Sequence, residues 1–126
     1  MDSCFVNDLP HHLLFPKMAL VVHHGGAGTT ATAAKAGVPQ IIIPHILDQF
    51  YWADRIHALG LGPKPIRRSK LTGEKLKGAI IEVVSNDRFR QRAREISLIL
   101  RKQDTLGHAI RLIEAESFLN GNVKGR

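Results

Sequence analysis

Apolar runs of strand length alternate with helical patterns along the first half of the chain. Residues 18–23 and 38–43 form continuous apolar runs, as expected of strands in a buried parallel sheet. Between them, residues 29–36 are rich in alanine and predict a helix that ends at Gly37. Strands joined by helices predict parallel pairing, so the chain is assigned to the α/β class with a Rossmann-like parallel sheet.

Shorter elements are expected on either side of this unit. Residues 4–6 form a strand candidate, and a further edge strand is expected near Leu61. Asp48 is expected to cap a helix that runs to about Leu59, with Gly60 as its stop.

The second half of the chain has helical periodicity. Helices are predicted to start at Thr72, at residues 85–87 and at Asp104 or Thr105. Their apolar stripes comprise Leu76, Ala79, Ile80 and Val83, then Phe89, Ala93, Ile96 and Leu100, then Leu106, Ala109, Ile110 and Ile113. Because strands come first and three helices follow, we expect the second half of a doubly wound domain. Residues 1–119 are assigned to this partial domain, and residues 120–126 to a polar tail.

Composition narrows the class of protein. With 126 residues, 44% of them apolar, the chain has the size and apolar content of one globular domain. Cys4 is the single cysteine, so a reducing, cytoplasmic compartment is expected. No apolar run approaches the roughly 20 residues of a transmembrane helix.

The positive charge is concentrated in one region. Residues 67–102 carry eleven Lys and Arg against four acids, while the whole chain has a net charge of +7. We interpret this region as a solvated helical face, with contact to an anionic membrane surface as the alternative. Nucleic acid is not an expected partner, because Phe89 is the single aromatic in the region and no nucleic-acid motif occurs.

Three glycines lie within four residues, between the first apolar run and the helix after it. Gly25, Gly26 and Gly28 would let backbone N–H groups approach a diphosphate closely, and the helix adds its positive end. His24 can donate from its ring, and Thr29 lies in the first helical turn. These residues predict a nucleotide site. A turn that needs glycine only for packing is the alternative.

The glycines belong to a longer pattern. Residues 24–30, 36–40 and 48–53 read HGGAGTT, AGVPQ and DQFYWA, and Pro44 precedes the last of these segments. The pattern resembles the nucleotide-sugar signature of family 1 glycosyltransferases, which are two-domain GT-B enzymes. The closer similarity is to the bacterial and fungal branch that glycosylates antibiotics, sterols, flavonoids and macrolides. Residues 7–11 also resemble that family's lead-in to the strand.

The resemblance implies a role for each matched residue. Asp48 and Gln49 would hydrogen-bond the donor sugar, and the Thr29 hydroxyl would reach a phosphate oxygen. The diphosphate would be held by His24, Gly25, Gly26, Ala27, Gly28 and Thr29. The nucleobase and ribose would lie along Leu9, Pro10 and His11.

The resemblance also implies inverting transfer from a UDP- or dTDP-sugar to a small lipophilic acceptor. The nucleotide sugar is the co-substrate, and no cofactor or metal is expected. In the family, a His oriented by an Asp near the start of an N-terminal acceptor domain activates the acceptor hydroxyl. No residue of this chain matches that pair, so no catalytic residue is assigned. The chain is expected to be inactive without an N-terminal acceptor-binding domain or a companion chain.

The sequence offers three other interpretations. Residues 26–31 fit a dinucleotide fingerprint, with Asp48 as its acidic partner, but residues 44–47 separate that acid from the strand before it. The histidines at positions 11–12, 23–24 and 45 lack the spacing of a metal site. A non-catalytic module that forms a homodimer through an open sheet edge is the third alternative.

Overall fold

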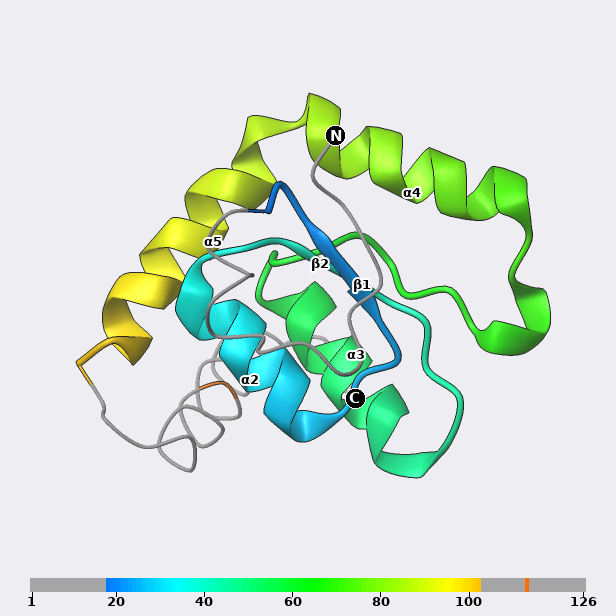
Figure 1. The fold of residues 1–126 in the computed structure, drawn as a ribbon, viewed down its shortest axis with the longest axis horizontal. Coiled ribbons are helices and arrows are strands. Elements are labelled where there is room, and N and C mark those ends of the chain that lie inside the picture. Colours follow the sequence, from blue (N-terminus) through cyan, green and yellow to red (C-terminus); the bar gives the residue numbers. More distant parts are fainter. Residues whose placement is uncertain (1–17, 103–112, 114–126) are drawn as a thin grey trace.

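The computed structural model describes residues 18–102 and Ile113. A parallel sheet of two strands forms its centre, with Val21 paired to Gln40 and His23 to Ile42. Figure 1 shows the strands and the helices that follow them. The order is β1 (Val21–His23), α2 (Ala27–Ala36), β2 (Gln40–Ile42) and α3 (Leu47–Ala58). The predicted α/β class and parallel pairing are confirmed.

Two further helices, α4 (Gly73–Ser85) and α5 (Asp87–Leu100), follow a short 3₁₀ turn at Arg68–Lys70. Thr72 accepts a hydrogen bond from the Lys75 N–H at 3.1 Å, and Asn86 accepts one from the Arg88 N–H at 3.0 Å. Both predicted helix starts are confirmed, because each side chain satisfies an N–H that the helix leaves without a partner. The strand candidate at residues 4–6 and the predicted third helix, apart from Ile113, lie outside the described residues.

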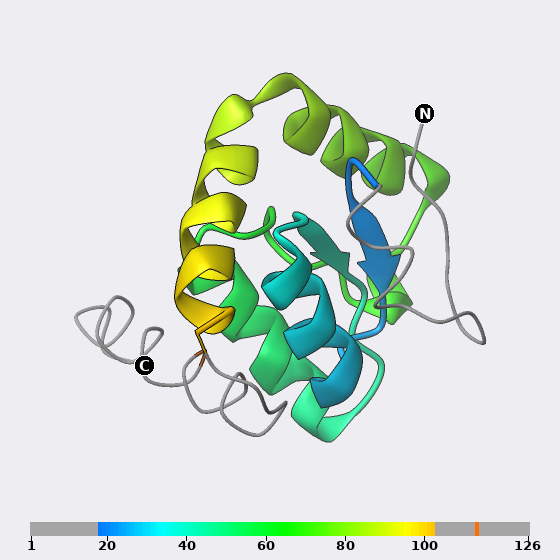
Figure 2. The same cartoon turned by 60° about the vertical axis from the view of Figure 1, so that its left-hand side comes forward.

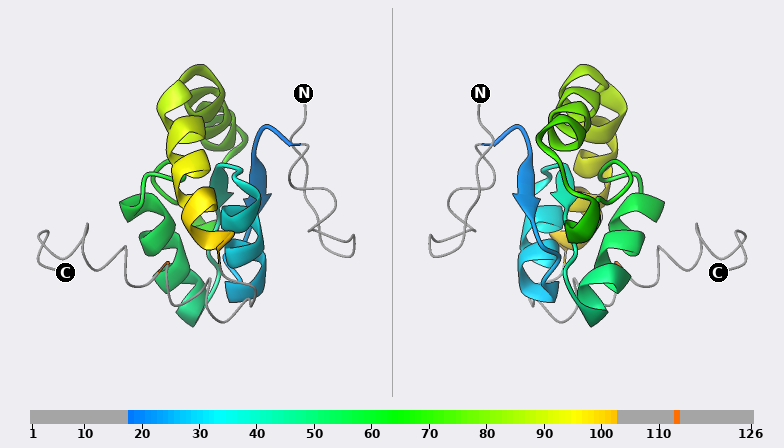
Figure 3. Two further views of the ribbon diagram at one scale, coloured as in Figure 1. Left: turned by 90° about the vertical axis from the view of Figure 1, so that its left-hand side faces the viewer. Right: turned by 90° about the vertical axis from the view of Figure 1, so that its right-hand side faces the viewer.

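Helices cover both faces of the sheet. Side chains alternate along each strand, so each face carries apolar side chains against which a helix can pack. Figures 2 and 3 show α4 above the strands and α2 and α3 below them. Leu20, Val22, Ile41 and Ile43 pack with Ala79 and Val83 of α4. On the other face, Ile42 joins a cluster formed by α2, α3 and α5, with Trp52, Ile56, Ala93, Ile96 and Leu100 among its members. None of the described helices has the length and apolar character needed to cross a membrane.

Helix α2 ends as its sequence predicts. Gly37 has a φ of +78°, and its N–H donates to the carbonyl oxygen of Ala34 at 3.1 Å. The next N–H, of Val38, donates to the carbonyl oxygen of Ala33 at 3.2 Å. A left-handed residue after the last helical turn favours glycine, since it carries no Cβ.

Two local predictions were wrong. The N-cap of α3 is Ile46, and Asp48 lies in the first turn of the helix. No strand forms at Leu61, although its carbonyl oxygen accepts from the Gln40 N–H at 2.8 Å. The chain bends at residues 61–63 and does not continue the pairing as a ladder, and a Cβ on Gly62 would collide with the carbonyl oxygen of Gln40.

Candidate functional site

The glycine turn after β1 packs directly on the start of α3. Gly25 has a φ of +100°, a conformation that residues with a side chain rarely adopt. A Cβ on Gly25 would lie 3.0 Å from the carbonyl oxygen of Gln49 and 3.0 Å from Cγ2 of Ile42. Because Gly25 has no side chain, the glycine turn, assigned from the sequence to the diphosphate, can pack closely on Gln49, which is assigned to the sugar.

The turn leads straight into the N-terminus of α2. Gly26 is the N-cap and offers no side-chain acceptor, and the first helical hydrogen bond runs from the Thr30 N–H to the Gly26 carbonyl at 2.9 Å. Within the described residues, no hydrogen bond engages the N–H groups of Ala27, Gly28 or Thr29. Three backbone donors at the positive end of a helix form an arrangement that binds phosphate well.

The His24 ring stands beside these donors. His24 is exposed, and a Cβ on Gly26 would lie 3.6 Å from its Cε1 atom, so the ring covers the turn. Its centroid lies 5.7 Å from that of His45, which follows β2. The two neighbouring strands thus each present an imidazole at the same edge of the sheet.

His45 and Arg68 are functional candidates that the sequence analysis did not assign. The pKa of His45 lies below its usual value of 6.5, because the ring is partly desolvated and because Arg68 and His24 add positive charge. Arg68 is held at this edge by its N–H, which donates to the carbonyl oxygen of Pro44 at 3.3 Å. For His45 the sequence offered one signal, its position directly after the carboxyl end of β2. Arg68 follows α3 in the sequence, so its place at this edge was visible only in the structure.

The start of α3 is built around Gln49. Its Oε1 atom accepts from the N–H groups of His45 at 2.7 Å and of Ile46 at 3.1 Å. Asp48, beside it, is exposed and carries its charge in the first turn of the helix. Leu47 has a φ of +31° and is 85% exposed, so strained backbone precedes Asp48.

A hollow of about 500 Å³ adjoins this edge. It lies between the loop after β2 and the segment at Arg67–Ser69, and the Arg67 guanidinium stands 5.5 Å above the Phe50 ring. Its lining is Pro44, His45, Phe50, Arg67, Arg68 and Ser69. The charged groups among them are cationic, so the hollow favours an anionic ligand.

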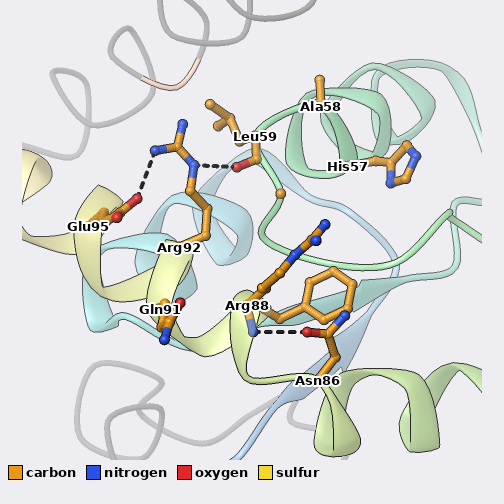
Figure 4. A pocket seen from close by; sticks show the side chains of 10 residues that line it. His57, Ala58, Leu59, Asn86, Arg88, Gln91, Arg92 and Glu95 are labelled. Atoms are coloured by element: carbon orange, nitrogen blue, oxygen red, sulfur yellow. Dashed lines mark hydrogen bonds and ion pairs between the residues drawn. The ribbon is translucent and has the colours of Figure 1, made fainter.

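Figure 4 shows a second hollow, of about 440 Å³, at the opposite end of α3. There Arg92 donates from Nε to the carbonyl oxygen of Leu59 at 2.8 Å and pairs with Glu95 at 3.1 Å. The helix has 12 residues, so its two ends lie about 16 Å apart. Because Arg92 satisfies a C-terminal carbonyl of α3, we interpret this region as a helix-end contact separate from the glycine turn.

The predicted site residues fall into two groups. The segment from His24 to Thr29 lies at one edge of the sheet, where Gly25 packs on Gln49, and Asp48 lies next to Gln49 in the first turn of α3. Leu9, Pro10 and His11 lie outside the described residues, so their assignment to base and ribose stays a prediction. Among the described residues, no three His, Cys, Asp or Glu side chains are grouped to hold a metal ion.

Comparisons with known proteins identify the family of the chain. Residues 3–102 match the family described as "Erythromycin biosynthesis protein CIII-like, C-terminal domain". A sterol 3-beta-glucosyltransferase from Arabidopsis thaliana is 44% identical over 105 residues, covering 83% of this chain and 17% of the relative. The chain therefore spans about a sixth of that relative's length.

Solved glycosyltransferase structures share the fold. VinC in complex with dTDP superposes with a TM-score of 0.67 and 29% identity, over 87% of this chain and 29% of VinC. The spinosyn rhamnosyltransferase SpnG complexed with thymidine diphosphate gives a TM-score of 0.67 and 26% identity, over 84% of this chain and 29% of SpnG. Both similar structures hold a nucleoside diphosphate.

Proposed function

The chain belongs to the erythromycin biosynthesis protein CIII-like C-terminal domain family, a part of family 1 glycosyltransferases, and we propose that it binds the diphosphate and sugar of a nucleotide-sugar donor. The observation that carries the proposal is the N-terminus of α2. It presents the N–H groups of Ala27, Gly28 and Thr29 beside the His24 ring, and Gly26 before them carries no side chain to block an anion.

The proposed chemistry is stabilisation of a leaving group. During transfer, the bond between the anomeric carbon and the diphosphate oxygen breaks, and the diphosphate keeps the electron pair. The acceptor oxygen bonds to the anomeric carbon, and its proton passes to a base outside the described residues. Fixed N–H groups and an imidazole meet the developing negative charge without having to reorganise.

The sugar would lie towards α3. Asp48 is exposed next to the glycine turn and is free to accept from sugar hydroxyls. Gln49 already uses Oε1 to hold the loop at His45 and Ile46, so its amide N–H groups would face the sugar. We propose that Gln49 both shapes the loop and contacts the donor.

The acceptor is proposed to be a small lipophilic molecule of the sterol class. This rests on the 44% identity to the Arabidopsis sterol glucosyltransferase, which extends over most of the chain. That relative is far longer than the matched segment, so a further domain is proposed to supply the acceptor pocket and the base. Donor binding is the part of the function that this chain can be tested for alone.

Calorimetric titration of the full chain with UDP, dTDP and NAD tests the proposal. We expect binding of UDP or dTDP, and His24→Gln should weaken it about tenfold, since one hydrogen bond to a charged group is lost. His57→Gln is the matched control, because His57 is exposed at the far end of α3. Preference for NAD, or equal loss in both variants, would contradict the proposed site.

A further inference from the structure

A buried series of three hydrogen bonds runs behind the glycine turn. The Gly25 N–H donates to Nδ1 of His23 at 3.0 Å, and Nε2 of His23 lies 2.6 Å from Oε1 of Gln40. Nε2 of Gln40 then donates to the carbonyl oxygen of Thr30 at 3.2 Å. His23 is 8% exposed and Gln40 1% exposed, so the series is closed off from water.

The donors and acceptors in this series have one consistent assignment. A backbone N–H can only donate, so Nδ1 of His23 must be the acceptor, and the ring proton of the neutral imidazole sits on Nε2. That proton points to Oε1 of Gln40. A backbone carbonyl can only accept, so the amide nitrogen of Gln40 must face Thr30. The constraints at the two ends agree on the orientation of both side chains.

The strand register brings the two side chains together. Gln40 is paired with Val21, and side chains two residues apart share a face, so His23 and Gln40 lie on the face covered by α2. The rest of this face is apolar, with Val21 packed against Ala33. Two polar side chains are costly in such surroundings unless their groups are paired. Their partners here are the turn and the first part of α2.

We propose that His23 and Gln40 are positioning residues that fix the glycine turn and so aim the N-terminus of α2 at the donor diphosphate. The part of this inference that concerns the diphosphate rests on the proposed function. The Gly25 N–H already donates to His23 inside the protein, so the backbone donors that remain for an anion are those at the start of α2. Without the hold on Gly25, the turn could rotate and carry these donors away from a productive direction.

Gln40→Met tests the proposal, because methionine has nearly the same shape and offers no comparable hydrogen-bond partner. Nitrogen NMR of the ring should show the Nε2–H form of His23 in the parent chain. In Gln40→Met only the Gly25 N–H still favours that form, so we expect a fraction of the Nδ1–H form to appear as the hold on the turn weakens. Amide exchange at Gly25 should become about tenfold faster, which corresponds to losing one buried hydrogen bond. UDP or dTDP should bind about tenfold more weakly for the same reason. Gln91→Met, an exposed site on α5, is the matched control and should change none of these quantities.

His23→Asn provides a second and independent test. An asparagine oxygen can take the place of Nδ1 and accept from the Gly25 N–H, although the side chain is too short to reach Gln40. We expect protection of the Gly25 amide and nucleotide affinity to be kept within about threefold in His23→Asn and lost in His23→Leu. Equal behaviour of these two variants would overturn the positioning role, and so would an Nδ1–H ring in the parent chain.

The outcomes separate this inference from the proposed function. If the parent chain binds neither UDP nor dTDP, donor binding by this chain fails. The ring form of His23 and the exchange of the Gly25 amide still decide whether the series holds the turn. If the nucleotide binds and Gln40→Met leaves both the affinity and the exchange unchanged, the positioning role fails while the proposed function stands.

Discussion

The rings of His24 and His45 lie 5.7 Å apart and are tilted by 42°, although the two residues follow different strands. Parallel pairing causes this, because the carboxyl ends of neighbouring parallel strands meet at one edge of the sheet. Arg68 lies close enough to lower the pKa of His45 further. The edge is therefore electropositive in the absence of a ligand, and an anion bound there would relieve the repulsion.

The lowered pKa of His45, which is caused by desolvation of the ring and by the positive charge of Arg68 and His24, predicts how donor binding depends on pH. The pKa of His45 lies below its usual value of 6.5, and a bound diphosphate should raise it, so binding should take up a proton. We expect the affinity for UDP to increase as the pH falls from about 7.5 to about 6. Calorimetry in buffers of different ionisation enthalpy measures the proton uptake.

His45→Gln is the control, because the phosphate of the ligand itself titrates in the same range. The difference between this variant and the parent chain isolates the contribution of the imidazole. Without ligand, the unfolded state binds the His45 proton more tightly. The free energy of unfolding should therefore rise with pH between the lowered pKa of His45 in the folded protein and its usual value of 6.5. His45→Gln should remove this pH-dependent contribution to stability. Identical pH profiles for the two proteins would contradict the assignment.

Asp48→Asn should separate the sugar from the diphosphate. The Asp48 carboxylate is exposed, so its replacement should cost at most about 0.5 kcal/mol of stability, through its favourable position at the start of α3. We expect a UDP-sugar to bind about tenfold more weakly, since strong acceptors for its hydroxyls are lost. UDP alone should bind as well as before or slightly better, because a negative charge is removed. Parallel titrations with the UDP-sugar and with UDP measure the two affinities, and an equal loss of affinity for both ligands would exclude a contact between Asp48 and the sugar.

Gln49 is predicted to matter for stability as well as for binding. Gln49→Leu leaves the N–H groups of His45 and Ile46 without their acceptor and should lower the free energy of unfolding by about 1 to 2 kcal/mol. Gln49→Glu keeps an acceptor oxygen in reach and should retain most of that stability. Urea denaturation of the two variants measures the difference. If both are as stable as the parent chain, the hydrogen bonds of Gln49 do not hold the loop.

Features with a local physical cause could be predicted from the sequence. Gly37 ends α2 because a left-handed residue favours glycine, and Thr72 and Asn86 begin helices because their side chains cap a nearby N–H. The glycine turn could also be predicted, because its position between a strand and a helix is visible in the sequence.

One local feature was missed: Asp48 looked like an N-cap, yet α3 begins at Leu47 after the N-cap Ile46, whose N–H donates to the Gln49 side chain. Features that depend on distant parts of the chain were missed as well. The proximity of His45 to His24, and the bond from His23 to Gln40, follow from the pairing of β1 with β2. Sequence spacing alone does not reveal which side chains such a pairing brings together.

Gly25→Ala is the sharpest test of the turn itself. Alanine would be strained at a φ of +100° and would press on Gln49 and Ile42 at 3.0 Å, so we expect a loss of about 2 to 4 kcal/mol in the free energy of unfolding. Gly78→Ala is the matched control, because Gly78 lies inside α4 with open space where its Cβ would be. That change should stabilise the protein by about 0.5 to 1 kcal/mol, since alanine favours the helix. Urea denaturation of the two variants should therefore give shifts of opposite sign. A Gly25→Ala variant as stable as the parent chain, or more stable, would mean that the turn tolerates a side chain and is not held against α3.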